Sequence, residues 1–242
     1  MGGIFPLAAS LFAMTSADAI AIVLNSKSST SVTTFAAAKE LIEREAAAGK
    51  PLQQFVIGVT TDDKALSKTY LDASREKIRM LAEKTDNALA WYLLSMETND
   101  FNLLLKAADG GNVQALNALG TIATSGAVSR SGAMSTNALE RVLGRSYDYF
   151  RRAASQRDAN GFINLGTCYL HGFGCRQDLA MAFMCFKAAA ELGHPEGMDN
   201  MSACYQFGHG VRKDSGLCLY WAMRGRAARG DEAAVKWLKE RK

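Results

Sequence analysis

The chain has 242 residues, of which 48% are hydrophobic and 21% charged, so it is long enough to bury a sizeable core. This composition excludes a chain that is disordered over most of its length. A net charge of +4 does not indicate a nucleic-acid-binding protein, and the basic excess lies in residues 211–242, with nine Lys or Arg against four Asp or Glu. Only three prolines, among many Ala, Leu, Met, Lys and Glu, favour helix over strand.

The chain opens with an apolar run. Residues 4–14 (IFPLAASLFAM) precede Ala17-Asp18-Ala19, small residues typical of a signal-peptide cleavage site. We therefore interpret residues 1–19 as a signal peptide or apolar N-terminal segment, and expect export to the periplasm or the exterior. No Lys or Arg precedes the run, so a packed N-terminal helix of a cytoplasmic protein is the alternative. Polar residues interrupt the run, which argues against a membrane span in the mature chain.

Residues 20–34 are predicted to be a polar linker, since they include the stretch SKSSTSVTT. Degenerate helical repeats are expected over 35–111 and clearer repeats over 112–230, with an insertion at 125–137. Residues 231–242 then form a C-terminal capping helix whose charged outer face ends the array.

A period of 36 residues organises the second half. The stretch GFGCRQD at 172–178 is followed 36 residues later by GHGVRKD at 208–214. Repeats of this length are typical of stacked helical hairpins. One position, the Leu of a Leu-Gly-like pair, can be followed through the whole array, at Ile57, Leu93, Leu119, Leu165, Met201 and Leu238.

Each clear unit is predicted to be a helix, a Gly-rich loop and a second helix. In the clearest unit the helices cover 160–171 and 179–192, Asp178 caps the second helix and Gly193 ends it. A dinucleotide-binding loop would need a preceding strand and a third glycine, and this loop has neither. The glycines are instead expected to adopt positive φ where the chain reverses between two helices.

This pattern resembles the Sel-like repeat (SLR) family, relatives of the tetratricopeptide repeat. The resemblance implies an all-α, right-handed superhelical solenoid of stacked antiparallel hairpins, with about five repeats and a capping helix. It also implies a scaffold or adaptor that binds proteins, and no chemistry by itself. In the clearest unit the residues that carry it are Leu165, Gly166, Tyr169, Gly172, Gly174, Asp178, Ala182, Lys187, Ala189, Ala190 and Gly193; in the next unit they are Tyr205, Gly208, Gly210, Val211, Asp214 and Trp221.

No catalytic, cofactor or metal site is predicted. Cys168, Cys185 and Cys204 are expected to be small core residues, the usual role of free cysteine. Cys168, His171 and Cys175 fall short of the four paired ligands of structural zinc. No nucleophile motif stands beside a histidine. The carboxylates of Glu43, Glu45, Asp62 and Asp63 are interpreted as solvated helix faces and caps.

The predicted function is therefore a non-catalytic scaffold or adaptor. It would bind a peptide or protein along the first helices of the repeats, which line the concave face of such an array. A hydrolase of cell-wall or β-lactam-like substrates, or a structural subunit of a larger assembly, is the alternative, and the oligomeric state is open. Nine positions beside the tracked Leu are expected to face the partner: Asn117, Ile163 and Asp199; Thr121, Thr167 and Ala203; and Thr124, Leu170 and Gln206.

Overall fold

The fold is described from a computed structural model of the chain, over residues 15–24, 32–129 and 136–240. The described residues form helices joined by turns, without a strand. The predicted class, an all-α helical-repeat fold, is confirmed. The chain divides into two compact units, Met1–Gly110 (unit 1) and Gly111–Lys242 (unit 2).

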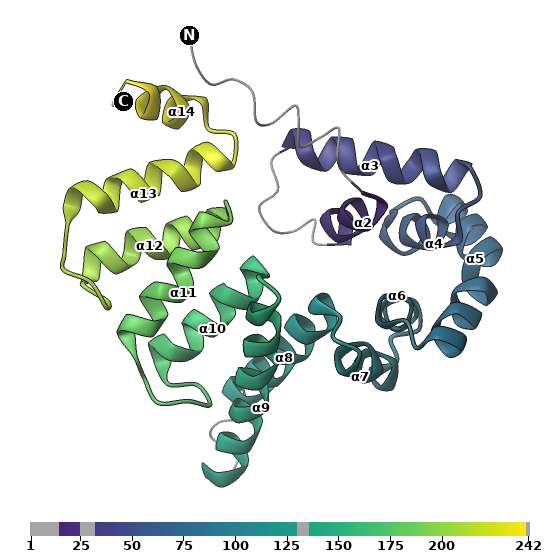
Figure 1. The fold of residues 1–242 in the computed structure, drawn as a ribbon, viewed down its shortest axis with the longest axis horizontal. Coiled ribbons are helices and arrows are strands. Elements are labelled where there is room, and N and C mark those ends of the chain that lie inside the picture. Colours follow the sequence, from purple (N-terminus) through teal and green to yellow (C-terminus); the bar gives the residue numbers. More distant parts are fainter. Residues whose placement is uncertain (1–14, 25–31, 130–135, 241–242) are drawn as a thin grey trace. The chain divides into compact units, whose positions relative to one another are not determined.

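Unit 1 contains six described helices, each packed against the next along the chain (Figure 1). Its core includes Ile42, Phe55, Ile78 and Leu93, all fully buried. The helices are α2 (Ser16–Leu24), α3 (Val32–Ala47), α4 (Pro51–Thr60), α5 (Lys64–Thr85), α6 (Ala88–Thr98) and α7 (Phe101–Asp109).

Helix α2 includes part of the segment interpreted above as a signal peptide and linker. Ala19, Ile20 and Val23 of this helix are buried, and the helix packs against α3 and α4. The expected cleavage site at Ala19 therefore falls inside a helix of unit 1. The remaining residues of that segment, 1–14 and 25–31, lie outside the described residues. No helix in the described ranges is long and apolar enough to cross a bilayer.

Unit 2 is built from three helical hairpins, α8/α9, α10/α11 and α12/α13, with α14 packed on α13. The second helix of one hairpin packs against the first helix of the next (Figure 1). The helices are α8 (Val113–Ser129), α9 (Thr136–Ser155), α10 (Ala159–His171), α11 (Leu179–Glu191), α12 (Pro195–Phe207), α13 (Ser215–Ala228) and α14 (Glu232–Lys239).

The insertion expected at 125–137 falls at the tip of the first of these hairpins. Its start extends α8 to Ser129 and its end begins α9 at Thr136. Residues 130–135 lie outside the described residues.

The doubled Gly-x-Gly loops join the helices of the last two hairpins. Gly172 and Gly208 end the first helices with φ of 74° and 79°, and Gly174 and Gly210 have φ of 69° and 71°. Asp178 then caps α11, because its carboxylate accepts the backbone N–H groups of residues 180 and 181. The expected positive φ is confirmed, and it explains why the loop repeats with the hairpin.

The cysteines expected in the core lie there. Cys168, Cys185 and Cys204 are buried and unpaired by disulfides. Burial raises the pKa of the Cys168 thiol to about 12, and that of Cys185 to about 11. These thiols stay protonated at neutral pH and pack as apolar groups.

Candidate functional site

The nine predicted positions lie on three neighbouring helices of unit 2. Helix α10 lies against both α8 and α12, the first helices of the adjoining hairpins. The structure therefore brings the three helices that carry the predicted positions together along one side of the repeats (Figure 1).

The side chains of the first row are occupied by contacts within unit 2. The Nδ2 of Asn117 donates to Oδ1 of Asp158 at 2.7 Å, across to the start of the next hairpin. Ile163 is 5% exposed. Asp199 forms an ion pair with Arg229, whose Nη1 lies 3.3 Å from its Oδ1. Asn117 and Asp199 therefore already have partners and Ile163 is buried, which the sequence analysis did not foresee.

The second row is open. Thr121 is exposed, and Thr167 and Ala203 are half-buried. The Thr167 hydroxyl donates to the carbonyl of Ile163 in its own helix at 3.0 Å, so its oxygen lone pairs remain for an acceptor role. This row is the smallest in side-chain volume, which lets another backbone approach closely.

The third row is mixed. The hydroxyl of Thr124 donates to the carbonyl of Gly120 at 2.9 Å, and Leu170 packs against the core around Phe186. Gln206 is exposed, and Phe207 beside it is 56% exposed. A large exposed ring is the kind of group that anchors a partner. The sequence analysis did not name Phe207, although an apolar residue just before Gly208, outside the core stripe, was the available signal.

The described residues offer no cluster of three or more His, Cys, Asp or Glu side chains that could hold a metal ion. In the stretch that suggested such a site, Cys168 is buried in the core while His171 is exposed and stacks on Phe173, with ring centroids 5.2 Å apart. The two side chains thus lie in different environments, one in the core and one at the surface.

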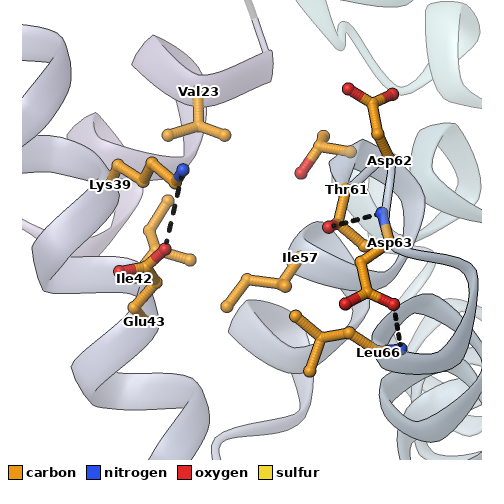
Figure 2. A pocket seen from close by; sticks show the side chains of 10 residues that line it. Val23, Lys39, Ile42, Glu43, Ile57, Thr61, Asp62, Asp63 and Leu66 are labelled. Carbon is orange, nitrogen blue, oxygen red and sulfur yellow. Dashed lines mark hydrogen bonds and ion pairs between the residues drawn. The ribbon is translucent and has the colours of Figure 1, made fainter.

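Unit 1 contains a pocket of about 410 Å³ that the sequence analysis missed. Figure 2 shows Lys39 and Glu43 of α3 on one side, and Thr61, Asp62 and Asp63 of the turn between α4 and α5 on the other. Apolar side chains complete the lining, namely Val23, Ile42, Ile57 and Leu66.

Asp62 and Asp63 at this pocket differ in their hydrogen bonding. Asp63 caps α5 as expected, accepting the backbone N–H groups of Ala65 and Leu66 at 2.9 and 3.1 Å. The carboxylate of Asp62 is exposed, and no described side chain pairs with it. The residues come from separate helices, so only their packing reveals the pocket.

The hairpins of unit 2 define a helical-repeat protein. Residues 133–158, 163–194 and 195–222 match the family model of the Sel1 repeat, so these parts of unit 2 are Sel1 repeats. Proteins of this family are in general protein-interaction scaffolds, and the fold is typically non-catalytic.

Two solved structures are similar to the chain. A Sel1 repeat protein from Oxalobacter formigenes is 24% identical, with 53% of this chain and 90% of that chain covered and a TM-score of 0.46. A protective antigen of uropathogenic Escherichia coli strains that displays an SLR fold is 19% identical, with a TM-score of 0.53. The latter match covers 83% of this chain and 44% of the antigen, so the chain spans less than half of that protein. No curated protein matches the chain significantly.

Proposed function

We propose that the chain is a non-catalytic scaffold or adaptor that binds a peptide or protein along α8, α10 and α12. The observation that carries this proposal is the open row formed by Thr121, Thr167 and Ala203, one residue from each first helix. Small side chains at equivalent positions of successive repeats give a partner a regular, closely approachable surface.

The third row supplies the edge of this surface. Gln206 offers both a donor and an acceptor, and the exposed ring of Phe207 offers apolar area. The first row contributes indirectly, because the Asn117–Asp158 contact joins neighbouring repeats and the Asp199–Arg229 contact joins α12 to the end of α13 in the last hairpin. With one aromatic anchor, we expect modest affinity.

The test adds bulk and charge to the open row. Thr121, Thr167 and Ala203 are replaced together by Arg, and the natural partner is captured with the tagged wild-type and variant chains. We expect capture to fall at least tenfold, because three long cations occupy the space in which the partner's backbone would lie. Circular dichroism and the melting temperature of the variant verify that it remains folded.

A matched control adds the same three charges elsewhere. Met181, Met184 and Leu217 are exposed on the second helices α11 and α13, and their replacement by Arg should leave capture unchanged. Equal capture by both folded variants and the wild type would contradict the proposed surface.

Export, expected from the N-terminal sequence, is also proposed, and N-terminal sequencing of the natively expressed protein decides it.

A further inference from the structure

We propose that unit 1 carries a second binding site, for a small organic cation, in the pocket between α3 and the α4–α5 turn. The ligand class is an ammonium group on an aliphatic or aromatic body. This site is separate from the peptide-binding row of unit 2 and does not depend on it. The proposal follows from the pocket's size, its apolar lining and its charge.

The apolar lining fits the body of such a ligand. Ile42 is 1% exposed and Val23 8%, so they close the inner wall, and Ile57 projects into the gap (Figure 2). Leu66 is 40% exposed, which is high for a large aliphatic side chain at the rim of a pocket. The volume of about 410 Å³ lies within the range of roughly 300–1,000 Å³ found for small-molecule sites.

The charges of the lining favour a cation. Among the lining residues, Glu43, Asp62 and Asp63 are acidic and Lys39 is the single basic residue. The Asp63 carboxylate already accepts two backbone N–H groups at the start of α5, where the helix dipole offsets part of its charge. Asp62 is left as the acidic group that an ammonium can approach without displacing a described partner. An anionic ligand would meet an excess of negative charge.

The Lys39–Glu43 pair does not block this arrangement. Lys39 Nζ lies 3.8 Å from Glu43 Oε1, and both side chains are more than half exposed, at 61% and 56%. Such an exposed pair adds little to stability. An incoming ammonium can therefore share Glu43 with Lys39 at small cost, while Asp62 adds negative charge from the other wall of the pocket.

The experiment uses three ligands with a similar body and different charge. The full ¹⁵N-labelled chain is titrated with 2-phenylethylammonium, 2-phenylethanol and 3-phenylpropionate, and the amide shifts are followed by NMR. We expect the cation to bind with the lowest Kd and to shift amides of residues 57–66. We expect the alcohol to bind up to about fivefold more weakly and the anion more weakly still. Added salt should reduce the advantage of the cation.

Variants separate the charged part of the site from the apolar part. Asp62→Asn should weaken binding of the cation by up to about fivefold and leave binding of the alcohol unchanged. Leu66→Gln should weaken both ligands. Glu76→Gln is the control, because it removes one exposed carboxylate of α5 outside the pocket, and it should change neither.

Four results would overturn the proposal. In the first, the alcohol or the anion binds as tightly as the cation. In the second, the shifted amides are scattered over the surface and do not gather around the pocket. The third is an equal effect of Glu76→Gln and Asp62→Asn. A cation that fails to bind at millimolar concentration would also overturn it, because the site would then have no affinity for its own ligand class.

Discussion

Gly166 follows Leu165, the leucine position that recurs in every repeat, and it is small because an aromatic ring packs on it. A Cβ added to Gly166 would lie 2.7 Å from Cε1 of Phe186, a buried ring of α11. In the next hairpin the equivalent pair is Ser202 and Ala222, and the Ser202 hydroxyl donates to the carbonyl of Cys218 at 2.9 Å. Glycine is thus needed where the second helix carries Phe, and a larger residue is accepted where it carries Ala.

Gly166→Val should therefore destabilise the protein by about 1–3 kcal/mol, because overpacking displaces a ring that has no free space to enter. Urea unfolding followed by circular dichroism measures this change. Gly144→Val is the matched control, since a Cβ at Gly144 of α9 meets nothing within 4 Å. An equal loss of stability in the two variants would show that β-branching in a helix, and not contact with Phe186, causes the effect.

At the scale of the elements, neighbouring repeats are joined by polar contacts at the starts of the first helices. His194 precedes α12 and is 5% exposed, with its Nε2 3.1 Å from Oδ1 of Asn160 on α10. Burial lowers the pKa of His194, nearby Asp158 opposes this shift, and Arg229 adds to it. The imidazole is thus held neutral at the junction between two hairpins.

This junction predicts a pH dependence of stability. The folded pKa of His194 lies below its unfolded value, about 6.5, so the unfolded state binds the proton first as the pH falls. The contribution of neutral His194 to the free energy of unfolding should therefore be complete above that pH and should decline below it. Urea unfolding at pH 7.5 and pH 5.0 measures the decline, and His194→Gln should reduce it. A decline of the same size in the variant would assign the effect to other groups.

At the scale of the whole molecule, the chain combines two units of different charge. Residues 1–110 contain 11 basic and 13 acidic residues, and residues 111–242 contain 17 basic and 11 acidic residues. Each unit has its own buried core, with Phe55 and Leu93 in unit 1 and Phe186 and Met201 in unit 2. The proposed peptide-binding row lies entirely in unit 2.

Unit 2 should therefore fold alone. A fragment of residues 111–242 is expected to give a helical circular dichroism spectrum and a cooperative unfolding transition, because its hairpins bury their apolar faces against one another. It should also capture the partner of the full chain, with weaker capture as salt is added if the basic residues contribute. A helical, cooperative fragment that fails to capture the partner would place the binding surface elsewhere.

Much of the fold was predictable because its signals are local. The loop glycines at 172 and 174, the cap at Asp178 and the end of α11 follow from backbone conformations that only certain residues adopt readily. A turn needs the same residues wherever it occurs, so repetition of the hairpin repeats the pattern in the sequence. The sequence by itself thus determined the helical hairpins, their period and the burial of Cys168, Cys185 and Cys204.

The tertiary structure decided which side chains are free. Asn117 and Asp199 occupy predicted binding positions, yet both side chains are already paired within unit 2, because their partners Asp158 and Arg229 come from distant parts of the chain. The pocket of unit 1 has the same origin, since its lining residues come from separate helices. A sequence records the residue types along one chain, whereas contacts between helices depend on packing that brings remote residues together.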